Sequence, residues 1–283
     1  MAFEEIMLEK EDQIATITLN RPQKKNALTY QMTVEMLAAI DDVARDHNIR
    51  VVVLTGAGEA FSAGGDFKFA EVKEGEIGTQ QAEDIWVEAQ KAGHAPGQFL
   101  TPLHKIIVAL PQLDKPVIAM LKGDVVGGGF GISLACDMRV GAHNTRFLIG
   151  YSRLGLVPNT GEGWILPRLV GVGKALELMM TSEFVSAEEA YRIGLLNRLV
   201  AVEELENETK RLAQRLIRIP PVTQRMMKQQ VYSALETDAQ SSLIFSVACC
   251  LLSMAAEDQH EAVRAFAERR TPIYKDTLLF EDK

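Results

Sequence analysis

Cysteine is scarce in this chain, with three among 283 residues. Cys136, Cys249 and Cys250 form no C-x-x-C motif, and an odd number of thiols cannot pair completely within one chain. We therefore expect reduced thiols and a cytoplasmic protein. Long apolar runs are also missing, because the longest, 106–110 and 117–121, are far too short to span a bilayer. The acidic N-terminus does not resemble a signal peptide, so no membrane association is predicted.

The chain has no excess of positive charge. Its 30 Lys and Arg against 38 Asp and Glu give a net charge of −8, which argues against nucleic acid as a partner. It contains no G-x-x-x-x-G-K-[ST], no G-x-G-x-x-G after a strand, no H-E-x-x-H and no G-x-S-x-G. The five histidines are scattered without the spacing of metal ligands. These absences remove the usual support for nucleotide hydrolysis, dinucleotide redox chemistry, a bound metal and a hydrolase triad.

Alternating strand and helix patterns occupy the first part of the chain. Short runs rich in β-branched or apolar residues at 14–19, 51–55 and 117–121 are typical of strands, and 29–43 has apolar residues at helical spacing. This alternation predicts an α/β core with parallel strands. Beyond about residue 173 the strand signals fade. The later segments predict helices at 187–193, 202–218, 222–235, 242–255 and 257–269. We divide the chain into a core, 1–200, and a helical region, 201–283.

Two glycine-rich segments follow predicted strands. The first is A-F-S-A-G-G-D-F-K at 60–68, and the second runs from Lys122 to Asp137 and contains G-G-G-F-G at 127–131. Each puts small residues where a strand gives way to a helix, and backbone N–H groups are unpaired at a helix start. Two such groups from different loops can bind one carbonyl oxygen as an oxyanion hole. Either segment alone is better explained by tight turns and close helix packing.

Together with other motifs in the same order, the two segments resemble the crotonase (enoyl-CoA hydratase/isomerase) superfamily from about Ile14 to Tyr274. The matching motifs are N-R-P at 20–22 with N-A-L at 26–28, F-S-A-G-G-D-F-K at 61–68, K-P-V-I-A at 115–119, G-G-G at 127–129, A-C-D at 135–137, G-L-V-P at 155–158, A-E-E-A at 187–190 with G-L at 194–195, and F-A-E-R-R at 266–270 with Pro272.

The resemblance implies a crotonase-like spiral ββα core with a C-terminal helical trimerisation region, assembled as a homotrimer or a hexamer. It implies an acyl-CoA thioester as substrate, with CoA as part of that substrate and no separate cofactor. By position, the N–H groups of Gly65 and Gly128 correspond to the oxyanion donors. The substrate-binding positions are Lys24, Lys25, Ala63, Asp66, Phe67, Lys68, Phe266 and Arg269. Of these, Phe266 and Arg269 match positions that contact the CoA of a neighbouring subunit.

The sequence departs from this pattern where the family's hydratases carry two glutamates. Those positions hold Gly131, which has no side chain, and Tyr151, whose phenol has an ordinary pKa of about 10. Some related isomerases place an aspartate directly after the G-L-x-P proline, where this chain has Asn159. The segment G-G-G-F-G-I-S-L-A at 127–135 also resembles 4-chlorobenzoyl-CoA dehalogenase, whose functional histidine corresponds to His104 and whose nucleophile falls on Asn159.

The remaining polar candidates are Tyr151, Asn159, Glu162, His104 and Asp66. Tyr151 is either a proton donor or part of the pocket wall, and Glu162 is either a base with a raised pKa or a carboxylate favoured at a helix start. Asp66 is expected to cap or orient its loop. Isomerisation or another enolate chemistry fits these residues better than two-glutamate hydration. The alternatives are a hydrolase, a decarboxylase, a dehalogenase-like member, and a non-catalytic acyl-CoA binder.

Overall fold

A six-stranded sheet forms the centre of the protein. The computed structural model describes residues 3–66, 91 and 100–276. The strand order is β1-β2-β3-β4-β6-β9, in which β1 and β2 pair antiparallel and every later pair is parallel. The strands are β1 (Ile6–Glu11), β2 (Ile14–Leu19), β3 (Val51–Gly56), β4 (Val117–Leu121), β6 (Met138–Ala142) and β9 (Arg198–Val200). A smaller sheet pairs β5 (Asp124–Val126), β7 (Arg146–Leu148) and β8 (Val185–Ser186).

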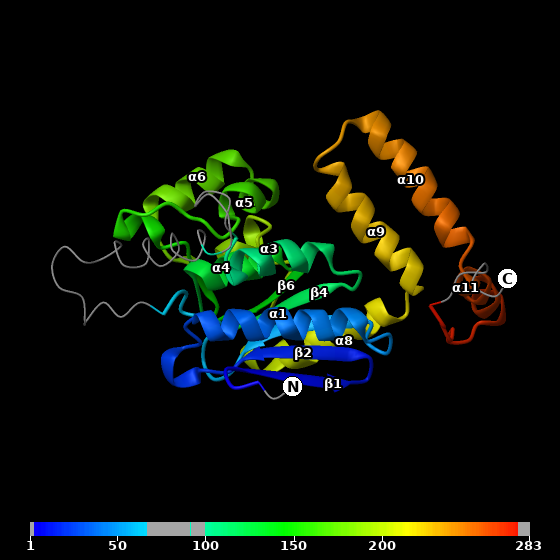
Figure 1. Cartoon of the computed structure of the whole chain (residues 1–283), viewed down its shortest axis with the longest axis horizontal. Helices are drawn as coiled ribbons and strands as arrows, with labels where there is room; N and C mark the ends of the chain where they lie inside the picture. Colours follow the sequence, from blue (N-terminus) through cyan, green and yellow to red (C-terminus); the bar gives the residue numbers. More distant parts are fainter. Residues whose placement is uncertain (1–2, 67–90, 92–99, 277–283) are drawn as a thin grey trace.

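Helices bury both faces of the large sheet, which explains why β3 is apolar along its whole length. Val52 and Leu54 of β3 belong to one core cluster with residues of α1 (Tyr30–Arg45), α3 (Pro102–Gln112) and α4 (Gly127–Ala135). Val51 and Val53 point to the opposite face and pack in a second cluster with residues of α8 (Leu205–Ile217). Figure 1 shows α1 and α8 on either side of the strands. Helices α5 (Glu162–Val170), α6 (Val172–Thr181) and α7 (Ala187–Arg192) complete this part.

The last three helices are α9 (Pro221–Ala234), α10 (Ala239–Met254) and α11 (Glu257–Glu268). In Figure 1, α9 and α10 form a hairpin that extends away from the sheet, and α11 lies at the open end of the hairpin, near the start of α9. The hairpin is anchored to the core by Asp137, which accepts hydrogen bonds from the Val117 N–H (2.7 Å) and the Tyr232 hydroxyl (2.8 Å) and pairs with Lys228 Nζ at 2.8 Å. Burial raises the pKa of Asp137 although Lys228 and its hydrogen bonds oppose this.

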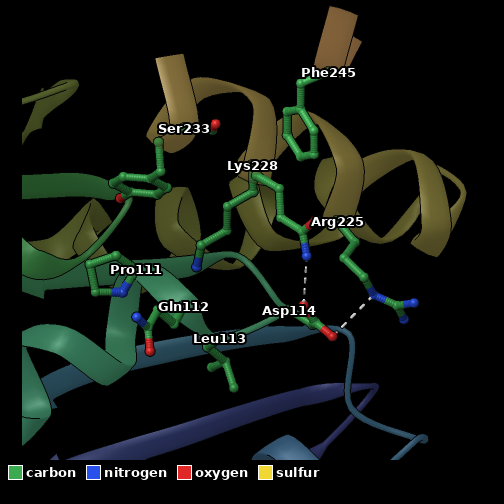
Figure 2. A pocket seen from close by; sticks show the side chains of 10 residues that line it. Pro111, Gln112, Leu113, Asp114, Arg225, Lys228, Ser233 and Phe245 are labelled. Atoms are coloured by element: carbon green, nitrogen blue, oxygen red, sulfur yellow. Dashed lines mark hydrogen bonds and ion pairs between the residues drawn. The ribbon is translucent and has the colours of Figure 1, made fainter. Parts of the chain in front are cut away.

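A pocket of about 300 Å³ lies beside this anchor, between α9, α10 and the connection from α3 to β4. Figure 2 shows Arg225 and Lys228 from α9 and Phe245 from α10 around it. Asp114 pairs with Arg225, with 3.4 Å between Oδ2 and Nε. The described part of the chain contains no helix long and apolar enough to cross a membrane.

The predicted strands at 14–19, 51–55 and 117–121 and the predicted helices are confirmed, with ends that differ by a few residues. The expectation that strands fade after residue 173 is wrong at two places. The strand β8 pairs with β7 in the smaller sheet. The later strand β9 joins the edge of the large sheet beside β6. Its three residues are too few to show an alternating pattern, and pairing with Val140 to Ala142 is what makes them a strand. The helix α8 packs on that same sheet, whereas α9 and α10 extend from it.

Candidate functional site

The two glycine-rich turns meet through a short parallel bridge between Ser62 and Val125. The Ser62 N–H donates to the Asp124 carbonyl (3.0 Å), and the Val126 N–H donates to the Ser62 carbonyl (2.9 Å). Gly65 and Gly128 each lie three residues beyond a bridged residue, so the bridge brings both turns to the same edge of the core. The sequence anticipated both turns, and the pairing between them requires the tertiary structure.

The turns approach too closely for side chains. Gly64 has a φ of +90°, and a Cβ atom there would lie 3.1 Å from the Val126 carbonyl oxygen and 3.6 Å from the Gly127 Cα. Gly127 has a φ of +50° and its Cβ direction faces the Gly64 Cα at 3.7 Å. Glycine is the residue that adopts this backbone and leaves room for the neighbouring turn. The glycine pairs 64–65 and 127–128 are therefore adjacent in space.

Both proposed donor groups are available. Gly128 is the second residue of α4, and the first four N–H groups of a helix have no partner within it. On the other turn, the Gly64 carbonyl accepts from the Leu28 N–H (2.7 Å) and the Asp66 N–H donates to the Leu28 carbonyl (3.0 Å). The Gly65 N–H lies between these two bonds and donates to no residue in the described part of the chain.

Buried polar side chains hold the first turn in place. Asn26 is fully buried, and its amide donates to the carbonyls of Ala57 (2.9 Å) and Ala60 (2.8 Å). Ser62, also fully buried, donates to the Asn26 carbonyl at 2.8 Å. Ala63 is joined to the same loop because its N–H donates to the Lys25 carbonyl (2.8 Å). The N-A-L motif thus supports the backbone of the glycine turn.

The wall beyond Gly128 is built by Gly131 and Thr160. A Cβ atom on Gly131, one helical turn along α4, would lie 2.4 Å from Thr160 Oγ1 and 2.5 Å from the Thr160 carbonyl oxygen. Thr160 therefore occupies the space into which a side chain at position 131 would extend. No motif in the sequence marks Thr160. Its signal was indirect, since it lies beside Asn159 in the segment that resembles the isomerases.

A chain of hydrogen bonds leads inward from Tyr151. Its hydroxyl lies 3.1 Å from Thr160 Oγ1, and Thr160 Oγ1 donates to Glu162 Oε1 at 2.6 Å. The Thr160 N–H donates to Glu162 Oε2 at 2.8 Å. Tyr151 begins the 3-10 helix 151–154 and is half-buried, whereas Thr160 and Glu162 are 1% and 0% exposed. Glu162 is the first residue of α5, as the sequence indicated.

Burial perturbs both titratable groups in this chain. It raises the pKa of Glu162 above its ordinary value, against the opposing effect of the hydrogen bonds from Thr160. Burial also raises the pKa of Tyr151, and the nearby Glu162 carboxylate adds to this effect. Burial therefore favours the protonated form of the Glu162 carboxyl more than water does, and it strongly disfavours a free tyrosinate at Tyr151.

His104 and Asn159 are joined to one another beside this chain. His104 Nδ1 accepts from the Thr101 N–H at 3.1 Å, at the start of α3, and the ring is also bonded to the backbone of Asn159. Burial lowers the pKa of His104, although the bond to Asn159 opposes this, so the neutral ring is favoured. The side chain of Asn159 is exposed. The histidine thus connects the start of α3 to the loop that carries Thr160.

The predicted CoA-facing residues lie in three places, which are the first glycine turn with the loop beside it, the end of α11, and positions outside the described residues. Lys24 and Lys25 are exposed, and Lys25 Nζ pairs with Asp124 at 3.2 Å. Asp66 pairs with Arg21 at 2.8 Å, a contact that orients its loop. The remaining positions are Phe67 and Lys68, which lie outside the described residues, and Phe266 and Arg269, which lie at the end of α11.

The structure does not bring Phe266 and Arg269 to the glycine turns of the same chain. Figure 1 shows α11 at the opposite end of the molecule from α4. Phe266 is 88% exposed, and Arg269 ends the helix in the left-handed conformation. Within residues 3–66, 91 and 100–276, no group of three His, Cys, Asp or Glu side chains could hold a metal ion.

Comparison with known proteins identifies the family of the chain. The profile of the family described as enoyl-CoA hydratase/isomerase matches residues 9–277. The chain is 35% identical to the short-chain-enoyl-CoA hydratase of Clostridium acetobutylicum, over 95% of this chain and 97% of that protein. It is 34% identical to the crotonyl-CoA hydratase of Syntrophomonas wolfei, with the same coverage.

Solved structures give the same result. The enoyl-CoA hydratase from Bacillus anthracis superposes with a TM-score of 0.86 at 30% identity, covering 97% of this chain and all of that one. An enoyl-CoA hydratase subunit from Geobacillus kaustophilus gives a TM-score of 0.83 at 32% identity, covering 97% and 99%. The chain therefore belongs to the enoyl-CoA hydratase/isomerase family of acyl-CoA-processing enzymes, the crotonase superfamily.

Proposed function

We propose that the N–H groups of Gly65 and Gly128 bind the thioester oxygen of an acyl-CoA and stabilise the enolate that forms when a proton leaves the acyl chain. The observation that carries this proposal is the pair of glycine turns joined by the Ser62–Val125 bridge, each with an N–H free to donate. Negative charge develops on the oxygen in the transition state. Each such donor therefore lowers the activation free energy by about 3–4 kcal/mol.

The reaction that we propose is proton transfer between carbons of the acyl chain, which shifts a double bond. Hydration by two glutamates requires carboxylates at positions 131 and 151, and this chain has Gly131 and Tyr151 there. Thr160 also fills the space beside Gly131. Removal of a carbon-bound proton leaves its electron pair in the enolate, and return of the proton to another carbon completes the isomerisation. The hydroxyl of Tyr151 is our candidate for the group that exchanges this proton.

Water addition is the second candidate, because both curated relatives named above are hydratases. The two reactions differ in product mass. Incubation with a panel of enoyl-CoA thioesters distinguishes a gain of about 18 mass units, the mass of water added in acid–base catalysis, from an unchanged mass with a new retention time. Release of free CoA would instead support the hydrolase, decarboxylase or dehalogenase-like alternatives, and CoA binding without turnover would support the non-catalytic binder.

The oxyanion hole is tested by removing one donor. Gly128→Pro deletes the N–H at the second position of α4, where proline is tolerated in a helix. Gly173→Pro makes the same change at the second position of α6, where no atom lies within 4 Å of the Cβ direction. We expect Gly128→Pro to lower kcat by about 10²–10³-fold and Gly173→Pro to leave it unchanged. Equal kcat values for both variants would refute the assignment of Gly128.

For CoA binding we propose Lys24, Lys25 and Lys68 at the phosphates, with Ala63, Asp66 and Phe67 lining the same turn. Support comes from the exposure of Lys24 and Lys25 beside the glycine turn. CoA is the part of the substrate that these residues bind, and the proposed reaction uses no separate cofactor. Lys24→Ala and Lys25→Ala should raise KM for acyl-CoA with little change in kcat, because both contacts are made equally in the ground and transition states.

We also propose assembly as a homotrimer, or a hexamer of two trimers, through α10. This helix packs mainly on α9 and exposes a row of large apolar side chains, comprising Leu243 (68%), Ile244 (64%), Val247 (61%) and Leu251 (61%). Apolar faces of this size on a soluble enzyme favour association. In this assembly Phe266 and Arg269 reach the CoA of a neighbouring subunit. Light scattering should give about three or six times the chain mass of 31.2 kDa, and a monomer would refute the assembly.

A cytoplasmic location is part of the same proposal. Its support is the set of three free cysteines, of which Cys136 and Cys249 are buried. Unpaired thiols persist in reducing compartments. Fractionation of the source cells should recover the protein with cytoplasmic markers.

A further inference from the structure

The buried carboxyl group of Glu162 lies behind Tyr151 and takes no part in the proposed oxyanion hole. Glu162 is 0% exposed, and both of its oxygens accept hydrogen bonds from Thr160. A helix-start carboxylate is normally solvated. We propose that Tyr151, Thr160 and Glu162 form a proton relay in which Glu162 stores the proton that leaves the acyl chain. This inference rests on the proposed enolate chemistry and adds Thr160 and Glu162 to it.

The polarity of the hydrogen bonds supports the relay. A threonine hydroxyl has one proton to donate, and Thr160 donates it to Glu162 Oε1 at 2.6 Å. The 3.1 Å contact between Tyr151 and Thr160 must therefore be donated by Tyr151. The lone pairs of the Tyr151 oxygen are then left to accept a proton. When Glu162 is protonated, the chain reverses, and Tyr151 donates outward.

The step balances without any other reactant. A proton moves from the substrate carbon to the Tyr151 oxygen, the phenol proton moves to Thr160 Oγ1, and the Thr160 proton moves to Glu162 Oε1. The electron pair of the broken C–H bond remains in the enolate, whose oxygen is held by the two glycine N–H groups. Reversal of the same three transfers delivers a proton to another carbon and returns Glu162 to the carboxylate. Because the transfers are concerted, no free tyrosinate forms.

The packing holds the three groups in register. Thr160 lies against Gly131, which is three residues after Gly128 and so on the same face of α4. Gly131 follows Gly128 by about 4.5 Å of helix rise, so Thr160 packs against the turn of α4 that follows the oxyanion donor. The titratable groups near Glu162 are Tyr151 from the 3-10 helix and His104 from α3, which is bonded to the Asn159 backbone. No charged side chain of the described residues opposes a proton on Glu162.

Two variants test the relay, each with a matched partner. Glu162→Gln keeps the shape and removes the titration, and Glu35→Gln does the same at a carboxylate that is 6% exposed and bonded to the backbone of residues 4–6. Thr160→Val removes the hydroxyl at constant volume, and Thr160→Ser retains it. The readouts are kcat and KM for isomerisation as a function of pH, and exchange of deuterium from D₂O into the α-carbon of a saturated acyl-CoA.

We expect Glu162→Gln and Thr160→Val to lower kcat and deuterium exchange by about 10²-fold or more with KM and the thermal shift by CoA unchanged. The ascending limb of the kcat–pH profile should disappear in Glu162→Gln and persist in Glu35→Gln. Thr160→Ser should retain activity within a few-fold of the parent. This rescue and the lost limb are results that a purely structural role for Thr160 and Glu162 would not produce.

The experiments distinguish failure of the relay from failure of the proposed function. If Tyr151→Phe loses activity while Glu162→Gln and Thr160→Val keep both their kcat and the ascending limb, the relay is wrong and the enolate proposal stands. If the parent protein neither isomerises any enoyl-CoA nor exchanges deuterium, the proposed function itself fails. If Thr160→Val does not fold, as judged by circular dichroism, the isosteric Glu162→Gln variant decides the question by its pH profile.

Discussion

Substitution of Gly131 by alanine tests how closely the loop around Thr160 packs on α4. The new methyl group would lie 2.4 Å from Thr160 Oγ1, 2.5 Å from the Thr160 carbonyl oxygen and 2.7 Å from Thr160 Cβ. Two of these atoms belong to the backbone or to its first side-chain carbon, so no change of rotamer relieves the contacts. The carbonyl must move by about 0.9 Å to reach an ordinary separation of 3.4 Å.

Overpacking of a closed site costs about 1–3 kcal/mol. For a chain of this length this loss corresponds to a fall in Tm of about 2–5 °C. Displacement of Thr160 also separates its hydroxyl from Tyr151, so we expect kcat to fall while CoA still binds. The matched control is Gly163→Ala in α5, where no atom lies within 4 Å of the Cβ direction. This control should be neutral or stabilising by about 0.5–1 kcal/mol.

The assay is thermal unfolding followed by circular dichroism, with kcat measured on the same samples. Gly131→Ala that matches the parent in both Tm and kcat would refute the packing described here. The same contacts predict that the double variant Gly131→Glu with Tyr151→Glu, which restores the hydratase carboxylates, fails to hydrate crotonyl-CoA. Efficient hydration by that variant would mean that the Thr160 loop moves aside easily.

Three further predictions concern other parts of the molecule. Lys228→Met leaves the buried Asp137 carboxylate without its cation and should lower the free energy of unfolding, measured in urea, by about 3–5 kcal/mol. The double variant Lys228→Met with Asp137→Leu should regain most of this loss. If the losses of the two single substitutions simply add in the double variant, Lys228 and Asp137 are not coupled. Burial raises the pKa of Cys136 to about 12, so maleimide at pH 8 should modify this thiol only after unfolding, and labelling of Cys136 in the native protein would contradict its burial. For Glu35, burial raises the pKa, but the hydrogen bonds from Gln31 and the backbone outweigh it and lower the pKa below the usual value of 4.5. Because the folded pKa is the lower one, Glu35 stabilises the fold above pH 4.5 and this contribution is lost as the pH falls further. Glu35→Gln should therefore reduce the difference in free energy of unfolding between pH 6 and pH 4. An unchanged difference would contradict the lowered pKa of Glu35.

Local patterns in the sequence predicted much of the architecture. Apolar runs such as 51–55 and 117–121 have to be buried on both faces, and this need is met by parallel strands between helices. The apolar residues within 29–43 predicted α1 because helical spacing is a pattern among residues that lie close together along the chain. The strand β9 was missed because its three residues become a strand only by pairing with β6.

Some candidate site residues could be identified from the local sequence, and others only from tertiary contacts. Gly65 and Gly128 could be identified from their turns and from the family resemblance, because close approach and positive φ impose glycine on the neighbouring positions. Their roles, like those of Tyr151, Asn159, Glu162 and His104, stay predictions until the variants are measured. Thr160 had no signal of its own, since its importance arises from Gly131, 29 positions earlier in the chain.

By itself, the sequence determined three strands of the large sheet, the helix near 29–43, the later helices and the two glycine turns, because these depend on side chains that are near one another along the chain. Tertiary structure alone decided that residues 64–65 lie against residues 127–128 and that Tyr151, Thr160 and Glu162 share one line of hydrogen bonds. It also decided that the Glu162 carboxyl is fully buried. The physical reason is that burial, the pKa of a carboxyl group and the direction of a donated proton depend on neighbours brought together by folding.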